Sequence, residues 1–436
     1  MLDAWTTPML DYITLRDVGP AASMTVNFAE RLTLLTGDNG AGKTFVLDIA
    51  WWALTRTWSD REAFPHRGKG VRPEIEYRVI GKRGPAAVVS AEFDFQRQTW
   101  KLPARRPAMP GLVIYVRVDG SFSVWDPARN YWKEAASLGV HAPDRPSAFH
   151  FDRRAVWDGL SVGENIICNG LIRDWVHWQL QRSAPFEALC SVLRTLSLPE
   201  EPALRPGAPM RVSLDDARDI PTVELAYGVV PVTHLSAGMR RILALAYLLV
   251  WAREEHAKAS ELLNQEPDSR LVVLFDEVET HLHPRWQRVI LPALIEATGA
   301  LSPGMTVQCI ASTHAPLVMA SAEPLFDTAR DRAFDLDVRG SEVVVSEIEW
   351  RLRGDANAWL TSRDVFGLGY ARSVPAEDAI RAAAEAVHRL GGVEVISSED
   401  RAELYRLHQE LGKQLSDLDP FWLRWFHFAD RHGVLA

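Results

Sequence analysis

Cysteine is scarce in this sequence, and no apolar run is long enough to cross a membrane. The 436 residues include three cysteines, Cys168, Cys190 and Cys309, and none of them forms a Cys-x-x-Cys pair. This usage excludes a disulfide scaffold and favours a reducing, cytoplasmic location. The most apolar stretch, residues 242–252, falls short of the roughly 20 residues that a bilayer requires. We therefore expect a buried helix there and no membrane association.

Positive charge is also in short supply. Lys and Arg number 48 against 57 Asp and Glu, giving a formal net charge of -9, which argues against a surface that coats nucleic acid along its whole length. Residues 56–106 are the exception, with twelve basic and six acidic residues. Two interpretations of this segment stay open: a DNA-contacting face, or a solvated strand face that balances acids elsewhere. The residues proposed to contact DNA are Arg97, Lys101, Arg105 and Arg106.

The pattern of apolar and turn residues predicts an α/β protein. Strands are expected at residues 12–15, 24–28, 32–35, 271–275 and 305–312, with an antiparallel sheet over 75–125. Helices are expected at residues 44–57, 155–195, 238–262, from Pro284 onward and over most of the last hundred residues. A proline-rich stretch at 198–210 interrupts the helical pattern.

The motif GDNGAGKT lies between an apolar strand and a helix, the context that a phosphate-binding loop requires. Its glycines let the backbone wrap phosphate oxygens, its lysine adds a positive charge, and its threonine hydroxyl can ligate Mg²⁺. A glycine-rich turn without a nucleotide is the alternative. The residues expected to bind nucleotide are Gly37, Asp38, Asn39, Gly40, Ala41, Gly42, Lys43 and Thr44.

The run LVVLFDE has the continuous apolar character of a buried parallel strand and ends in two carboxylates. In a phosphate-binding protein, Asp276 would hold Mg²⁺ and Glu277 would orient or deprotonate the attacking water. Strands often end in acids, so the pair gains its meaning from the glycine-rich loop that precedes it.

Two further motifs complete the set. LSAGMRR places Ser236, Ala237 and Gly238 at the start of a helix, where hydroxyl and free N–H groups can face an anion. An ordinary serine N-cap is the alternative interpretation. ASTHAP ends the next apolar strand and places His314 where a γ-phosphate would lie, although a histidine at a strand end is more often structural.

The four motifs, in this order, resemble the ATPase heads of the ABC superfamily. GDNGAGKT, DEVETHLHPRWQ and STHAPLV resemble most closely the SMC-like branch that includes the overcoming-lysogenisation-defect proteins and related defence-island ATPases. The resemblance implies a P-loop ABC-type head with ATP and Mg²⁺ as cofactors. It also implies that Lys43, Glu277 and His314 act catalytically within one chain. By the same resemblance, Ser236, Ala237 and Gly238 would face ATP on the partner of a homodimer.

His281 and His283 could also suggest a zinc site, since they follow two acids closely. Zinc requires three or four converging ligands. The resemblance instead places residues 279–283 in a loop between two subunits, with Pro284 opening a helix at its favoured first position. We therefore expect a nucleotide site here.

The sequence departs from its relatives in several ways. The motif LSAGMRR begins much farther from the P-loop than in transporter subunits, and the sequence has no heptads for coiled-coil arms. Asp335 and Asp337 match one strand of a Toprim nuclease, but no strand bearing a glutamate precedes them after His314, so we expect no intrinsic nuclease. The glutamine expected between the lobes has two weak candidates, Gln96 and Gln98.

We expect an ATPase head at residues 1–325 and a mostly helical region at 326–436. The apolar helical face at Trp422, Trp425 and Phe428 has two interpretations, a core of this region or, alternatively, a docking surface for a partner protein. The head would comprise an antiparallel β lobe at about 1–130, a helical inter-lobe insertion at about 131–225, and the lobe carrying LSAGMRR and the acidic pair at about 226–325. The expected function is that of a nucleotide-switched sensor ATPase of a defence system controlling a separate effector protein. A DNA-maintenance ATPase is the alternative, and a transporter subunit is less favoured.

Overall fold

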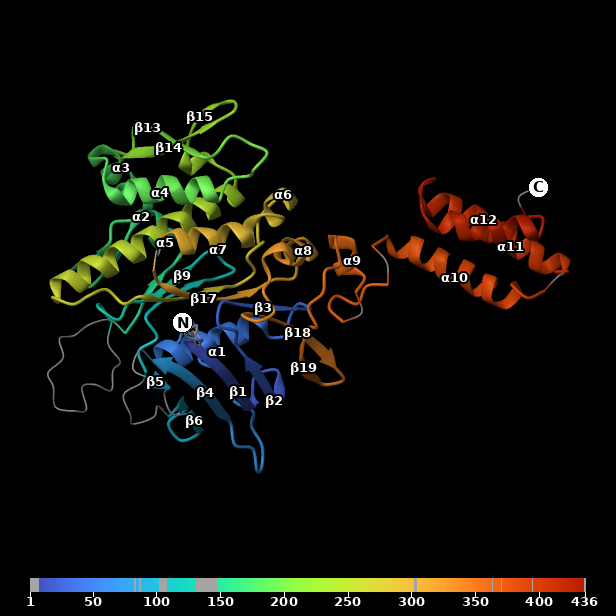
Figure 1. Cartoon of the computed structure of the whole chain (residues 1–436), viewed down its shortest axis with the longest axis horizontal. Helices are drawn as coiled ribbons and strands as arrows, with labels where there is room; N and C mark the ends of the chain where they lie inside the picture. Colours follow the sequence, from blue (N-terminus) through green and yellow to red (C-terminus); the bar gives the residue numbers. More distant parts are fainter. Residues whose placement is uncertain are drawn as a thin grey trace, which may run out of the picture. The chain divides into compact units, whose positions relative to one another are not determined.

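The computed structural model describes residues 8–81, 84–85, 88–101, 108–130, 147–301, 304–362, 364–369, 371–393 and 395–434. The chain divides into two compact units. The first comprises Met1–Trp359 with Asp364–Phe366, and the second comprises Leu360–Arg363 with Gly367–Ala436. The predicted α/β class is confirmed for the first unit (Figure 1).

A mixed central sheet organises the first unit. Its eight described strands follow the order β10-β9-β8-β16-β17-β3-β18-β19. Neighbours from β8 to β18 are parallel, and the pairs at both edges are antiparallel. The strands are β10 (Phe149–Phe151), β9 (Phe122–Trp125), β8 (Leu112–Val116), β16 (Arg270–Phe275), β17 (Thr306–Ser312), β3 (Leu32–Gly37), β18 (Asp331–Arg339) and β19 (Glu342–Glu347).

A second, antiparallel sheet follows the order β2-β1-β4-β6-β7, with β5 paired to β4. Its strands are β1 (Leu10–Val18), β2 (Ala21–Asn27), β4 (Glu74–Gly81), β5 (Gly84–Pro85), β6 (Val89–Asp94) and β7 (Thr99–Trp100). Helix α1 (Lys43–Thr55) packs with this sheet and with one face of the central sheet in a single apolar cluster. Trp51 and Trp52 are buried in that cluster, which explains why α1 is apolar nearly all round.

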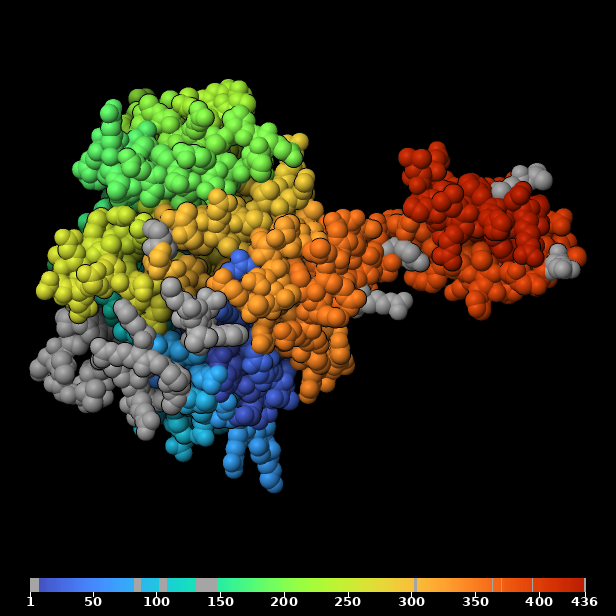
Figure 2. Space-filling model, in the orientation of Figure 1, coloured from blue at the N-terminus to red at the C-terminus, as the bar shows by residue number. Residues whose placement is uncertain are grey.

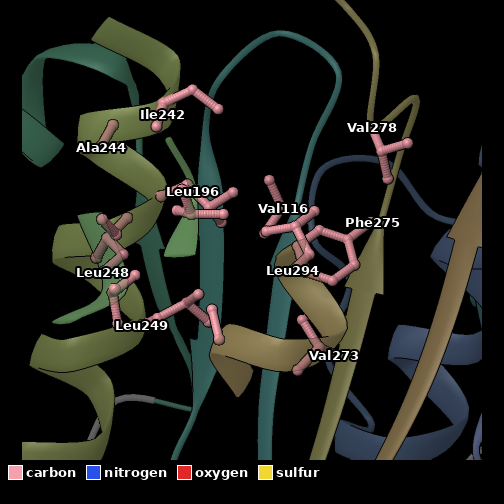
Figure 3. Packing of buried hydrophobic residues seen from close by; sticks show 14 of the residues in the cluster. Val116, Leu196, Ile242, Ala244, Leu248, Leu249, Val273, Phe275, Val278 and Leu294 are labelled. Carbon is pink, nitrogen blue, oxygen red and sulfur yellow. The ribbon is translucent and has the colours of Figure 1, made fainter. Parts of the chain in front are cut away.

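The other face of the central sheet packs against helices that include α5 and α7, and α3 and α4 pack on α5. The helices on this side are α2 (Arg153–Asp158), α3 (Leu171–Gln181), α4 (Ala184–Thr195), α5 (Ala237–Leu262), α6 (Pro284–Gln287), α7 (Ile290–Leu301) and α8 (Pro316–Ala322). Figure 3 shows Leu248 and Leu249 of α5 near Val273 of β16 and Leu294 of α7. The predicted helices at 238–262 and from Pro284 onward are therefore observed, and the apolar run at 242–252 is the buried part of α5. Within the described ranges, no helix is long and apolar enough to cross a membrane.

The region expected as a helical insertion contains strands as well as helices. A hairpin, β11 (Leu160–Val162) with β12 (Asn165–Cys168), lies between α2 and α3. The stretch predicted as a proline-rich break contains β13 (Arg205–Arg211), which pairs with β14 (Asp219–Leu225), followed by β15 (Gly228–Pro231). Pro206 and Pro209 are tolerated in β13 because it is an edge strand. Residues 131–146 lie outside the described residues.

Two sequence predictions need correction. The antiparallel sheet expected over 75–125 is split, because β8 pairs in parallel with β16 and so belongs to the central sheet with β9. The region from residue 326 is not helical at its start, because β18 and β19 extend the central sheet beyond β3. A continuous apolar strand such as β8 pairs according to its tertiary neighbours, which local periodicity cannot reveal.

The 3-10 turns η2 (Val232–His234) and η3 (Glu323–Leu325) lie before α5 and before β18, and the short helix α9 (Ala356–Leu360) follows β19. The second unit contains α10 (Val374–Leu390), α11 (Ser398–Gln414) and α12 (Phe421–Arg431). Ser373 and Ser397 cap α10 and α11. Trp422, Trp425 and Phe428 are buried in this unit's own core.

Candidate functional site

The glycine-rich loop lies between β3 and α1, as its motif predicts. Gly37, Gly40 and Gly42 have positive φ values of 129°, 80° and 94°, a conformation that other residues adopt only with strain. A Cβ atom on Gly37 would lie 2.1 Å from the carbonyl oxygen of Leu336, so β18 also requires glycine at this position. In Figure 2, a small blue surface patch from the N-terminal part of the chain lies among the yellow and orange segments.

Lys43 is held against the backbone of its own loop. Its Nζ donates to the carbonyl oxygens of Gly37 at 2.7 Å and Asp38 at 2.9 Å. The side chain is buried, and burial lowers the pKa of its ammonium group despite nearby carboxylates that act in the opposite direction. An ammonium has three donors, so one remains to face a ligand of the loop.

Thr44 and Asp276 are brought into contact, although 232 residues separate them in sequence. The Thr44 hydroxyl donates to the Asp276 carboxylate at 3.1 and 3.0 Å, and Ser312 Oγ donates to the same carboxylate at 2.8 Å. Burial raises the pKa of Asp276, and the two hydroxyl donors oppose that shift. A hydroxyl and a carboxylate side by side are the hard oxygen ligands that suit Mg²⁺.

Glu277 has a left-handed backbone with φ of 48°. Its N–H donates to Ser312 Oγ at 2.8 Å, and Thr280 Oγ1 donates to its Oε2 at 2.9 Å. A non-glycine residue in this region costs free energy and is found preferentially at functional sites. The carboxylate is therefore fixed at the carboxyl end of β16, beside Asp276.

Glu279 is a member of the site that the sequence motifs did not single out. It is 3% exposed, and its Oε1 accepts from the backbone N–H of His314 at 2.7 Å and lies 3.2 Å from His314 Nδ1. Burial raises the pKa of the Glu279 carboxyl. The Nδ1 atom of His314 also lies 3.6 Å from Glu277 Oε1. The repeated acid in DEVE was the available signal, because alternate residues of a short loop can turn toward the same site.

The LSAGMRR segment begins α5, with Ser236 as the N-cap that accepts from Met239 N at 3.3 Å. Ser236 and Ala237 are exposed. A Cβ atom on Gly238 would lie 2.8 Å from the carbonyl oxygen of His281 in the same chain. Ser236 therefore caps the helix, as one of the two interpretations of this segment expects, and it also lies at the surface.

Arg241 ties this helix to the end of β16. Its guanidinium donates to the carbonyl oxygens of Val118 at 2.8 Å, Glu277 at 3.2 Å and Asp276 at 3.4 Å. Burial lowers the pKa of Arg241, while the neighbouring carboxylates act in the opposite direction. No sequence pattern distinguished this arginine from Arg240 beside it.

His281 and His283 follow the acidic pair Asp276 and Glu277 in the sequence. Over the described part of the chain, no group of three or more His, Cys, Asp or Glu side chains is arranged to hold a metal ion. His283 instead caps α6 by accepting from Arg285 N at 3.3 Å, and Pro284 takes the first helical position. His281 is an exposed residue with φ of 64°. Among the described residues, no further side chains join His281 and His283 in an arrangement that could hold zinc.

The residues proposed to contact DNA are only partly covered by the structure. Arg97 and Lys101 are exposed around strand β7, and Lys101 Nζ lies 3.7 Å from Glu92. Arg105 and Arg106 lie outside the described residues. Gln96 and Gln98 are exposed in the turn between β6 and β7.

Comparisons with known proteins match both halves of the site. The family described as "AAA domain, putative AbiEii toxin, Type IV TA system" matches residues 210–320, and the family described as "AAA domain" matches residues 12–123. The Retron Vc95 probable ATPase of Vibrio cholerae serotype O1 biovar El Tor is 32% identical over 96 residues. That match covers 21% of this chain and 16% of the relative, so it spans only a small part of the relative's length.

Several solved structures show limited similarity. The SMC head domain from Thermotoga maritima is 14% identical with a TM-score of 0.38, covering 78% of this chain and 99% of that one. The Smc head domain with an extended coiled coil from Pyrococcus furiosus, bound to the C-terminal domain of ScpA, is 12% identical with a TM-score of 0.42, covering 78% and 96%. The recombination mediator protein RecF with ATP is 12% identical with a TM-score of 0.36, covering 80% and 100%.

The two family matches cover the glycine-rich loop and the remaining motifs of the site, and both families are described as AAA domains. The fold and these matches assign the chain to the class of α/β proteins with similarity to AAA domains. Within that class, a retron ATPase is one of its sequence relatives.

Proposed function

We propose that this protein binds ATP with Mg²⁺ and hydrolyses it to ADP and phosphate. The observation that carries the proposal is the contact between Thr44 and Asp276, which joins the start of α1 to the end of β16. This contact places the glycine-rich loop beside two carboxylates at one edge of the sheet. Nucleotides bind at the carboxyl ends of strands in open α/β sheets.

Each residue of the site has a proposed role. The backbone of residues 37–44 and the Lys43 ammonium hold the phosphates. Thr44 and Asp276 hold Mg²⁺, which when bound neutralises phosphate charge. Glu277 accepts a proton from the attacking water, and His314 donates to the γ-phosphate.

The working form that we propose is a homodimer in which two heads enclose two ATP molecules. Ser236 and Ala237 are exposed at the N-terminus of the 26-residue helix α5. Its free N–H groups and partial positive charge suit a phosphate group. Within the described residues, no hydrogen bond joins Ser236 to the loop at 37–44. A second copy is therefore the proposed source of the triphosphate that this helix faces.

The test combines two variants with light scattering. With ATP and Mg²⁺, Glu277→Gln should form a stable dimer without turnover, and Lys43→Ala should stay monomeric without binding nucleotide. Glu296→Gln is the matched control, because Glu296 is exposed on α7. Hydrolysis by Glu277→Gln at the wild-type rate would show that the base is misassigned.

The biological role that we propose is the sensor ATPase of an anti-phage defence system, acting in the cytoplasm on a separate effector. A retron ATPase relative and a matched family described by a type IV toxin–antitoxin system support this role. ATP binding and hydrolysis would shift the dimer between two states and thereby restrain or release the effector. Purification of the native complex tests this, since a stoichiometric second protein should co-elute and leave when nucleotide is removed.

DNA maintenance is the second candidate function. The exposed basic residues Arg97 and Lys101, within a segment of excess positive charge, favour it. Binding through phosphate contacts should weaken steeply with salt. Replacement of Arg105 and Arg106 by glutamate should abolish ATP-dependent DNA binding in a protein that purifies without an effector, and salt-insensitive or absent binding excludes this function.

A further inference from the structure

A cavity of about 280 Å³ lies beside the start of α5, on a different set of residues from the glycine-rich loop. The turn after β8, the start of α2, the start of α5 and His281 form its walls. Its size is close to the lower end of the roughly 300–1,000 Å³ usual for small-molecule pockets. Among the residues that line this cavity, Ala237 alone belongs to the nucleotide-contacting residues proposed above.

Positive charge is concentrated in this cavity, although the whole chain carries a net charge of -9. One carboxylate faces the cavity, that of Asp119, and its Oδ1 already accepts from Ser121 N at 2.9 Å and Ser121 Oγ at 2.6 Å. The cavity is lined by four guanidinium groups, those of Arg153, Arg154, Arg240 and Arg241.

The four arginines differ in how far their donors are already used. Arg241 is bonded to three backbone carbonyls, and Arg154 Nε lies 3.4 Å from Asp158. Arg153 and Arg240 are exposed, and neither forms an ion pair with another described residue. Their planar donor groups match the geometry of phosphate oxygens, which Arg binds with two parallel hydrogen bonds.

The rest of the cavity wall is apolar. Val116 and Phe122 are buried in its floor, Ala244 of α5 is also buried, and the Trp157 indole is partly exposed (Figure 3 labels Val116 and Ala244). An aromatic side chain beside arginines offers a stacking surface for a base next to donors for its phosphate. The cavity thus has one apolar part and one cationic part.

From this geometry we propose that the cavity is a second nucleotide site, which binds a single nucleotide unit through its phosphate and its base. The unit can come from a free nucleotide or from a phosphorylated end of a single-stranded nucleic acid. Arg153 and Arg240 bind the phosphate, and Trp157 contacts the base. Because Ala237 and Arg241 also line the cavity, its ligand touches the helix that begins with Ser236.

The test is titration calorimetry on the full chain, with AMP as the probe. AMP lacks the β- and γ-phosphates, and Lys43→Ala removes the competing site, so binding should be equal in the wild type and in Lys43→Ala. Arg153→Ala with Arg240→Ala should weaken AMP binding at least about tenfold, because the charge-assisted bonds are lost. Arg173→Ala is the matched control, since Arg173 is exposed on α3 away from the cavity.

The outcomes separate this site from the ATPase site. Loss of AMP binding in Lys43→Ala would assign AMP to the glycine-rich loop and overturn the inference. So would absent binding, or binding that the double arginine variant leaves unchanged. Equal affinity for inorganic phosphate would overturn the role of the base. If the double variant unfolds at a lower temperature than the wild type, the single variant Arg240→Gln replaces it in the same titration. A 5′-phosphorylated ten-nucleotide single strand that displaces AMP supports the nucleic-acid source, and failure to displace it supports the free nucleotide.

Discussion

The two sides of the ATPase site differ in burial and in the use of their polar groups. One side, here named the Walker side, consists of the glycine-rich loop and the residues after β16. There Lys43, Asp276 and Glu279 are 5%, 1% and 3% exposed and are hydrogen-bonded to neighbours in the same chain. The other side, named the signature side, is the LSAGMRR segment at the start of α5, where Ser236 and Arg240 are exposed. The difference shows that one chain holds the first set of groups by itself, and that the second set lies at the surface, where the proposed partner would meet it. Four predictions test this contrast.

The largest effect is expected on the Walker side, from Glu277→Gln. Removal of a general base lowers turnover by about 10²–10⁴-fold, while Lys43 and the loop still bind ATP. Steady-state hydrolysis and a nucleotide-binding titration measure the two effects separately. Loss of ATP binding together with turnover would show that Glu277 is needed for the fold of the loop and is not the base.

The next effect belongs to the signature side and compares two substitutions of Ser236. Both Asp and Asn are good N-caps, so both should keep α5 intact. Only Ser236→Asp places a negative charge where the partner's phosphate is proposed to lie, so ATP-driven dimerisation should be lost in that variant and kept in Ser236→Asn. Light scattering with ATP and Mg²⁺ decides, and equal dimerisation of both variants would contradict a trans contact.

A smaller effect is expected from Glu279→Ala. This variant tests how much the hydrogen bonds within the chain stabilise the Walker side. The backbone N–H of His314 would lose its acceptor at a partly buried position, a loss that costs about 1 kcal/mol. Denaturant unfolding measures this change in the free energy of unfolding. The exposed control Glu349→Gln should leave it unchanged. If Glu279→Ala and Glu349→Gln lowered the free energy of unfolding equally, the contact between Glu279 and His314 would not be what stabilises the site.

The last effect depends on pH and concerns Asp335, which lies on β18 opposite Thr36 of β3. Burial, with repulsion from Asp337, raises the pKa of Asp335 to about 6. The unfolded value is about 3.9, so the protonated carboxyl favours the folded state. The stabilisation of the folded state by the protonated Asp335 carboxyl is complete below about pH 4 and is lost as the pH rises through 6. Asp335→Asn should therefore be more stable than the wild type by about 1–2 kcal/mol at pH 7.5 and similar at pH 4, as measured by urea unfolding. A constant difference at both pH values would contradict the shift.

Much of the ATPase site follows from sequence because its parts lie at the ends of recognisable strands. The glycine-rich loop and the acidic pair each follow an apolar run, and parallel strands bring such ends to one edge, which predicts the meeting of Thr44 and Asp276. Their catalytic roles remain predictions. The contact of Glu279 with His314 and the reach of Arg241 depend on side-chain directions across packed elements, which no local pattern encodes.

The fold was less predictable where pairing with a distant strand decides whether a segment forms a strand. Strand β13 contains two prolines, and a proline-rich segment ordinarily predicts a turn, yet an edge position permits it. Strands β18 and β19 were missed because the sequence after residue 326 was dominated by the helical pattern of the second unit. The alternation of apolar and polar residues in β18 and β19 indicates a sheet only once β3 is known to lie beside β18.

The position of β3 has a consequence for synthesis on the ribosome. This early strand pairs with β17 and β18, which emerge only in the last third of the chain, and β18 presses its backbone against Gly37. Such distant pairings form late. In a nascent polypeptide, the strands that flank the glycine-rich loop are therefore complete only after Arg339 has been synthesised.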